Sequence, residues 1–487
     1  MVWRKHLHPS ILWVAHSPRW FLYRLVSDNC LAWWRWSFSG HRCCVRAKEA
    51  SLSAPHPESP AGAYGWRPII IIACLFFIIG FVTWLNGPLI TFVQVAFNLS
   101  TVSAFLVPMC FYLSYLIFPL PATLLAQRTG LRSGLVVALV IMAVGIAIFG
   151  ECVSMRWYPG ALSGLFVIGA GLSLLQITIN PYVTLLGPTQ KAAQRIAIMG
   201  VANKLAGIVA PIVLAMLVMR NINDIAARVK AAPDATTRDH ILDQFAHAVQ
   251  VPYLAMAVIL LVTAVGLARS SLPEIDISGA GQGTDSDDDG QDTRRGPTYL
   301  WLGVLCMFVY VGTEVMAGDA IGAYGASLGL PLDQTKFLTS LTLAAMMGGY
   351  ILGMFLVPRV FSQERYLGLS ALCGLVLCVL TWLTQGYVSV MCVALFGFAN
   401  SMILPSLFPI VIRDVEERGA QATALLVMAF SGGAVLPQLF VQFMPVMGVQ
   451  SAFVALMAPA YGLIVLYNVL IHRRNRARPV PVMMVES

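Results

Sequence analysis

The chain has 487 residues, of which 58% are apolar and only 11% charged, and its formal net charge is +8 at pH 7. Soluble domains carry about 25% charged residues, so this composition excludes an ordinary soluble protein and indicates many membrane spans. The positive charge collects in loops and at both ends, which indicates membrane orientation and argues against nucleic-acid binding. The ten cysteines lack the spacing of a metal site or a disulfide framework.

Residues 1–62 form an extension before the first apolar span. Tryptophan, arginine, histidine and cysteine are dense there, and Arg19, Arg24 and Asp28 interrupt its apolar stretches. Neither a signal-peptide pattern nor a spanning run emerges. We expect either a segment at the membrane interface or a translation start assigned too early. We favour the second, although no Met between Met1 and Met109 offers a later start, and we assign no functional residue here.

Twelve windows of about 20 apolar residues follow, and each predicts a transmembrane helix. The expected spans cover 69–92, 102–125, 133–153, 159–185, 196–219, 252–270, 298–321, 335–357, 366–384, 387–411, 421–443 and 451–471. Basic residues follow spans 2, 4, 8, 10 and 12, whereas the opposite short loops hold only Arg156 and Lys336. The positive-inside rule then places both termini in the cytoplasm.

Two polar segments interrupt this pattern. Residues 220–251 form a long excursion between spans 5 and 6, with apolar spacing at Ile241, Phe245 and Val249 that predicts a surface helix. Residues 268–297, with the run 285–289 of aspartate and serine, cannot bury a core and predict a cytoplasmic linker. The chain therefore divides into an N-terminal half at 63–267, this linker, a C-terminal half at 298–472, and a basic cytoplasmic tail at 473–487.

The two halves show signs of an internal duplication. Three residues of span 4 match three of span 10 at one constant offset: Gly169, Ser173 and Pro181 with Gly397, Ser401 and Pro409. Two parallel six-span repeats are typical of the major facilitator architecture, in which substrate binds between the halves near the membrane midplane. We therefore expect an all-α membrane protein of twelve transmembrane helices in two six-helix halves.

Several motifs resemble one family in detail. They are the segments 84–90 (WLNGPLI), 119–122 (PLPA), 180–188 (NPYVTLLGP), 200–207 (GVANKLAG) and 310–314 (YVGTE). Together, over about residues 67–471, they resemble the fucose–galactose–glucose permeases, a sugar/proton symporter branch of the major facilitator superfamily. The fucose permeases carry an Asp in span 1 and a Glu in span 4, where this chain has Gly87 and Gln176. The resemblance is therefore closer to the glucose and N-acetylglucosamine permeases.

Three charged residues lie well inside expected spans, away from the span ends, namely Lys204, Glu314 and Asp319. A charge in the membrane is costly, so each is a functional candidate with a partner to be found. Glu314 is expected either to bind a proton or sugar, or to form a structural ion pair with Lys204. Lys204 fits a counter-ion or a modulator of nearby carboxylates. Asp319 fits proton coupling or a helix-end role equally well.

Sugar recognition, which the resemblance implies, requires amides that both donate and accept hydrogen bonds, together with aromatic faces. The candidate amides are Asn86, Gln176, Asn180, Asn203 and Asn400, and the candidate aromatic residues are Trp84 and Tyr310. Asn180 fits equally well a cap for the backbone freed by Pro181, and the aromatic residues could be packing or interface anchors.

The resemblance implies a secondary active importer of glucose, galactose, fucose or N-acetylglucosamine, driven by proton symport through alternating access. We expect a monomer in the inner (plasma) membrane, with the lipid bilayer and a sugar as partners and no cofactor or metal. Sodium remains an alternative coupling ion. An uncoupled facilitator, a sugar or drug exporter and a non-transporting sugar sensor are the alternatives. An enzyme is not expected, because the spans hold no HExxH, no GxSxG and no aspartate pair at helical spacing.

Overall fold

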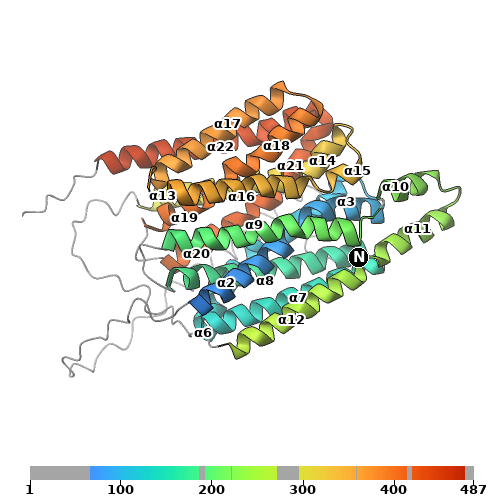
Figure 1. Ribbon diagram of the computed structural model, residues 1–487, viewed down its shortest axis with the longest axis horizontal. Helices are drawn as coiled ribbons and strands as arrows, with labels where there is room; N and C mark the ends of the chain where they lie inside the picture. The colour runs from blue at the N-terminus through green and yellow to red at the C-terminus, as the bar shows by residue number, and fades with distance from the viewer. Residues whose placement is uncertain are drawn as a thin grey trace, which may run out of the picture. The chain divides into compact units, whose positions relative to one another are not determined.

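The computed structural model describes residues 66–185, 192–220, 222–270, 272, 296–357, 359–413 and 419–477. The expected extension at 1–62, the aspartate-rich run at 285–289 and residues 478–487 lie outside these ranges. Every regular element within the described ranges is a helix (Figure 1). The fold is therefore all-α, as the apolar windows predict.

We call the helices from Trp66 to Arg269 the N-terminal half. They are α2 (Trp66–Trp84), α3 (Asn86–Ala96), α4 (Thr101–Ala104), α5 (Leu106–Ile117), α6 (Pro119–Thr129), α7 (Leu131–Ser154), α8 (Tyr158–Leu185), α9 (Ala192–Leu217), α10 (Ile222–Ala231), α11 (Ala235–His247) and α12 (Gln250–Arg269). In this half α8 packs against α5 and α7, and α2 packs against α9.

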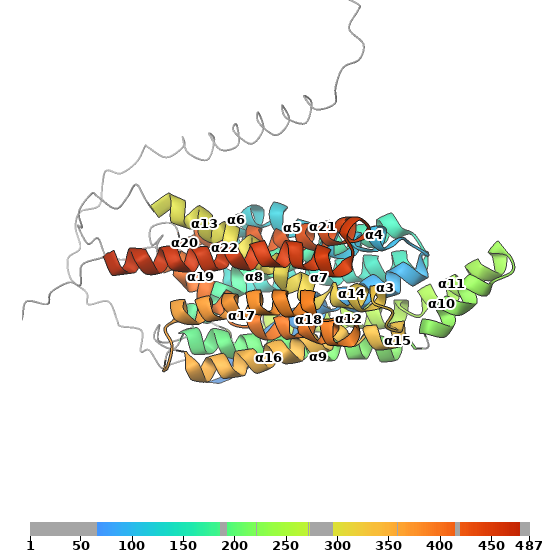
Figure 2. The same cartoon turned by 90° about the horizontal axis from the view of Figure 1, so that it is seen from above.

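We call the helices from Gly296 to Ala477 the C-terminal half. They are α13 (Gly296–Gly318), α14 (Ile321–Ser327), α15 (Leu332–Thr335), α16 (Leu338–Leu356), α17 (Gln363–Leu383), α18 (Gly386–Asn400), α19 (Ile403–Arg413), α20 (Gly419–Met428), the 3₁₀ turn η4 (Ala429–Ser431), α21 (Gly432–Met447) and α22 (Val449–Ala477). The halves meet where α9 runs beside α16 (Figures 1 and 2). They also meet where α5 packs on η4 and α21.

The number of membrane spans agrees with the sequence. Eleven of the described helical stretches are long and apolar enough to cross a membrane. A twelfth span is a bent pair, Thr101–Ile117 and Pro119–Thr129, whose parts form an angle of 55°. Pro119 begins the second part, and proline is the usual cause of such a sharp bend. The prediction of twelve spans is confirmed.

Five spans that the sequence predicts as continuous are broken. Span 1 breaks at Leu85 between α2 and α3, and span 2 breaks at Phe105 and Phe118 on either side of α5. Span 7 breaks at Asp319 and Ala320 between α13 and α14, and span 10 breaks between α18 and α19. Span 11 divides into α20, η4 and α21. Hydropathy does not reveal such breaks, because a window of about 20 residues averages over the helices on both sides of a break. Broken helices free backbone groups, which is tolerated where they are buried in protein or line a cavity.

Close helix crossings repeat between the halves. A Cβ on Gly169 of α8 would stand 2.1 Å from the Ser114 hydroxyl of α5, so only glycine allows these helices to approach. A Cβ on Gly397 of α18 would stand 2.1 Å from the carbonyl oxygen of Thr342 in α16. Gly169 and Gly397, and likewise Ser114 and Thr342, are separated by the same offset that relates the duplicated residues. The crossing of spans 2 and 4 is thus reproduced by spans 8 and 10.

The excursion between spans 5 and 6 is helical. The predicted surface helix is present as α11, which begins after Asp234 caps the backbone N–H of Thr237. Ile241 and Phe245 are buried, and the Phe245 ring lies 4.8 Å from that of Phe92 in α3. The excursion therefore packs onto the N-terminal half by the apolar face that its spacing predicts.

Candidate functional site

A cavity of about 770 Å³ lies among helices of both halves. This volume falls within the roughly 300–1,000 Å³ of small-molecule sites. Its polar lining residues are Thr83, Gln176, Asn180, Asn203, Lys204, Glu314 and Gln363, and its aromatic lining residues are Phe76, Trp84, Tyr112, Tyr115, Tyr350, Phe408 and Phe430. Amides, one ion pair and aromatic faces in an otherwise apolar wall can bind a small polar molecule that also has an apolar side.

The cavity extends toward one end of the helices. Its lining reaches Val183 and Ile196, on either side of the loop between α8 and α9. It also reaches Gln363 at the start of α17 and Ile412 near the end of α19. These are the helix ends next to the loops that carry most of the basic residues, and we call this end the basic side.

The halves are in contact at the opposite end, which carries α10 and α11. The Lys336 ammonium donates to the Met219 carbonyl at 3.0 Å, and the Leu332 N–H donates to Asn223 Oδ1 at 3.1 Å. One turn inward, the Ser340 hydroxyl donates to the backbone carbonyl of Ile208 in α9 at 2.9 Å. We call this end the closed side.

An ion pair joins the halves across the cavity. Lys204 Nζ of α9 lies 2.8 Å from Glu314 Oε1 of α13, and the two side chains are only 6% and 11% exposed. The same ammonium stands 4.3 Å from the centre of the Trp84 ring, in cation–π contact. Glu314 therefore forms the ion pair with Lys204 that the sequence offers as one of its two roles. Both residues line the cavity, where a ligand can reach them.

The predicted amides on α8 and α9 lie on the same wall. Trp84 Nε1 donates to Asn203 Oδ1 at 3.3 Å, and Asn203 Nδ2 donates to the Phe76 carbonyl at 3.4 Å. One turn apart on α8, Asn180 Nδ2 donates to Gln176 Oε1 at 3.3 Å. The Gln176–Asn180 bond uses one donor and one acceptor, so each amide keeps further capacity for a ligand.

The remaining predicted residues lie away from the cavity. Asn86 is 1% exposed and lies within the N-terminal half, beside Phe111 and Ile168. Asn400 accepts from the Tyr461 hydroxyl at 2.7 Å, and the Tyr310 hydroxyl donates to the Asn400 carbonyl at 3.3 Å. Both bonds are internal to the C-terminal half. Asp319 is buried on the closed side and is absent from the cavity wall.

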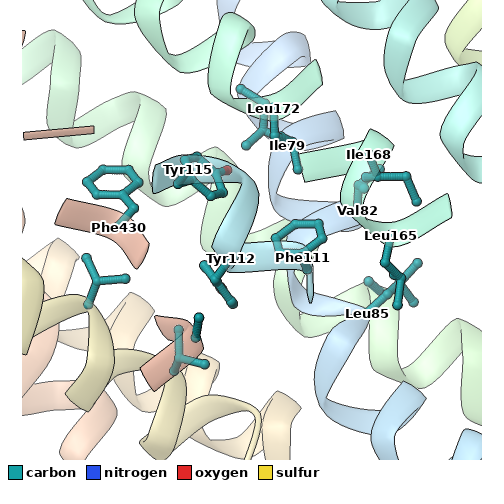
Figure 3. Packing of buried hydrophobic residues seen from close by; sticks show 14 of the residues in the cluster. Ile79, Val82, Leu85, Phe111, Tyr112, Tyr115, Leu165, Ile168, Leu172 and Phe430 are labelled. Atoms are coloured by element: carbon teal, nitrogen blue, oxygen red, sulfur yellow. The ribbon is translucent and has the colours of Figure 1, made fainter. Parts of the chain in front are cut away.

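Several aromatic residues of the wall are absent from the sequence prediction. Tyr112 and Tyr115 of α5 point toward the C-terminal half, where the Tyr115 ring lies 5.6 Å from that of Phe430 (Figure 3). Two tyrosines three residues apart put their hydroxyls on one face of a helix, which is a signal that the sequence contains. Tyr350 of α16 and Gln363 of α17 give no comparable signal.

Comparisons with known proteins place the chain in a family. Residues 72–437 match the Major Facilitator Superfamily. The glucose/galactose transporter of Brucella abortus is 30% identical over 402 residues, which cover 80% of this chain and 90% of that protein. The chain belongs to the fucose–galactose–glucose permease family. This permease-family chain is also 26% identical over 394 residues to the L-fucose-proton symporter of Escherichia coli, with 78% and 86% coverage.

A solved structure supports the fold. The transporter FucP, crystallised in the outward conformation, superposes on the permease with a TM-score of 0.66 at 23% sequence identity, covering 85% of this chain and 99% of that one. At this identity the likeness shows the fold alone. Among the described residues of the permease, no group of three His, Cys, Asp or Glu side chains could hold a metal ion.

Proposed function

We propose that this permease is a secondary transporter of a hexose or of N-acetylglucosamine. The observation that carries the proposal is the cavity between the halves, whose wall combines amides, aromatic faces and an ion pair. A sugar ring offers hydroxyl groups to Gln176 and Asn180 and an apolar face to Trp84. The names of the relatives, a glucose/galactose transporter and an L-fucose-proton symporter, support the same substrate class.

The transport cycle follows from the arrangement of the two halves. Residues 63–267 and 298–472 rock about the cavity, so that it faces one side of the membrane at a time. The positive-inside rule places the basic loops, and with them both termini, in the cytoplasm. Because the cavity extends toward the basic side, it faces the cytoplasm in this conformation. The chain acts as a monomer in the inner (plasma) membrane.

Proton coupling runs through the ion pair of Glu314 and Lys204. A proton on Glu314 removes the charge that holds Lys204 at 2.8 Å, and a sugar hydroxyl can then replace the lost partner. Binding of sugar and of proton thereby favour each other, as symport requires. Sodium is the alternative coupling ion, because carboxylate and carbonyl oxygens serve either cation.

Accumulation in proteoliposomes tests this function. With an acidic exterior, one of labelled glucose, galactose, fucose or N-acetylglucosamine is expected to accumulate and to leak out when an uncoupler is added. A sodium gradient in place of the proton gradient identifies the coupling ion. Accumulation of none of these sugars under either gradient contradicts active sugar import.

Uncoupled facilitation is the second candidate. It is favoured by Gly87 and Gln176, which occupy the positions where the fucose permeases carry carboxylates, and by the ion pair that already satisfies Glu314. In the same vesicles a facilitator exchanges labelled for unlabelled sugar without accumulating it. Export of a sugar or drug reverses the direction of accumulation, and a sensor binds sugar without any flux.

A further inference from the structure

Asp319 is a buried carboxylic acid whose side chain has no hydrogen-bond partner among the described residues. It stands in the break between α13 and α14 and is 1% exposed. Neither of its carboxyl oxygens makes a hydrogen bond, although the backbone of Gly87 in α3 faces the group. A Cβ on Gly87 would stand 3.2 Å from Asp319 Oδ1 and 2.4 Å from Thr339 Oγ1 of α16. Helices of both halves therefore close directly around this carboxyl group.

The charges around Asp319 leave it without a counter-ion. The ionisable groups that face it are Glu314 on its own span, Lys204 on α9 and Tyr112 on α5. Lys204 already pairs with Glu314 at 2.8 Å, so one cation stands among two acids. An ionised carboxylate that is buried and unpaired is very costly, and such a group takes up a proton instead. In this conformation Asp319 is therefore neutral.

Asp319 also lies where the halves must separate. It is on the closed side, where α3 of the N-terminal half packs against α14 of the C-terminal half. A Cβ on Gly322 of α14 would lie 3.7 Å from Thr91 Oγ1 of α3. Opening of the closed side moves α3 away from α14, admits water to Asp319 and removes the penalty for its ionisation.

We propose that Asp319 is a proton-binding site that controls the closed side of this transporter: the protonated acid permits closure and the ionised acid holds that side open. The inference rests on the proposed alternating access but requires no particular sugar. Because the closed conformation binds this proton more tightly, acid shifts the population toward closure and alkali shifts it toward opening. An acidic exterior would load Asp319 from outside and drive the inward step of the cycle.

The test is a distance measurement across the closed side at several pH values. Spin labels are attached at Met155→Cys, after α7, and at Tyr387→Cys, on α18, in a chain whose native cysteines are replaced by serine. Both positions are exposed, at 65% and 57%. Double electron–electron resonance spectroscopy of the purified protein then measures the distance between the two labels, which is short when this side is closed and long when it is open. Asp243→Asn, which neutralises an exposed acid of α11 at the same end of the molecule, is the matched control.

The proposal expects the long-distance population to grow as pH rises in the unsubstituted chain and in Asp243→Asn. In Asp319→Asn, which mimics the protonated acid, the short distance is expected to dominate at every pH. A pH response in Asp319→Asn equal to that of Asp243→Asn overturns the proposal. If Asp319→Asn does not fold, Asp319→Ser removes the same ionisation and is judged by the same criterion. The distances need no sugar, so failure of sugar uptake and failure of this inference are separate results.

Discussion

Replacing Lys204 with methionine is expected to abolish sugar accumulation and to destabilise the protein, whereas adding Glu314→Gln restores stability but not accumulation. The single substitution leaves the Glu314 carboxylate buried at 11% exposure without its partner at 2.8 Å. Breaking a buried ion pair in this way costs about 3–5 kcal/mol, while replacing both members by neutral groups is close to neutral. Glu314→Gln alone is likewise expected to lose pH-driven accumulation. Thermal unfolding midpoints in detergent and uptake in proteoliposomes measure both effects.

Arg156→Gln provides the control for this double-mutant cycle. Arg156 pairs with Asp243 at 3.1 Å, but their side chains are 23% and 55% exposed, so the loss is expected to be only about 0–1 kcal/mol. Two results would count against the role of the buried pair. One is a Lys204→Met variant no less stable than Arg156→Gln, and the other is normal pH-driven accumulation by Glu314→Gln.

A second large effect is expected from Gly432→Ala. A Cβ at this position would stand 1.8 Å from the carbonyl oxygen of Phe308, where α21 begins against α13. The obstacle is backbone, so the helices must move apart, and overpacking of this kind costs about 1–3 kcal/mol. We expect a lower unfolding midpoint and impaired transport, because α13 carries Glu314.

Gly348→Ala is the matched substitution. Gly348 lies in helix α16, and a Cβ there meets no atom within 4 Å. Its replacement is expected to be neutral or to stabilise the helix by up to about 1 kcal/mol through helix propensity. Equal unfolding midpoints for the two alanine variants would contradict the close crossing of α21 and α13 at Gly432.

The membrane topology follows from the sequence more directly than the path of each helix. Twelve apolar windows predict twelve spans because a bilayer requires about 20 apolar residues for each crossing. The same windows do not reveal the break at Asp319 and Ala320 or the 55° bend at Pro119, because hydropathy averages over both helical segments. Breaks depend on backbone contacts with other helices, which no single window contains.

The sequence likewise predicts some residues of the candidate site and not others. Rarity alone identifies Lys204 and Glu314, because charges are costly in membrane spans, and the structure brings both to one cavity wall. Asn86 and Asn400 were as polar as Gln176 in sequence, but the structure directs them into their own halves. Lipid and protein interior are both apolar, so a membrane helix lacks the pattern that would show which face meets the cavity.

The positions of the other polar and aromatic residues depend on contacts with residues that are distant in the chain. The side chain of Asn400 is bonded by Tyr461, 61 residues away, and Asp319 is enclosed by Gly87 and Thr339 from two other helices. Tyr112 and Tyr115 join the cavity wall because α5 packs on the C-terminal half. The spacing of Tyr112 and Tyr115 shows that they share one face of α5, but spacing along one span identifies the partner helix in none of these cases.

Equilibrium binding of labelled sugars to the purified protein tests most directly whether the cavity is a sugar site. Glucose, galactose, fucose and N-acetylglucosamine are measured with the unsubstituted chain, with Gln176→Ala, and with Gln94→Ala. Gln94 is a half-buried glutamine of α3 that bonds Thr101 away from the cavity. We expect saturable binding of at least one sugar, weakened by up to about tenfold in Gln176→Ala, since a hydrogen bond contributes about 0.5–1.5 kcal/mol, and unchanged in Gln94→Ala. Absence of binding by all four sugars, or equal affinity in the two variants, would contradict this assignment of the cavity.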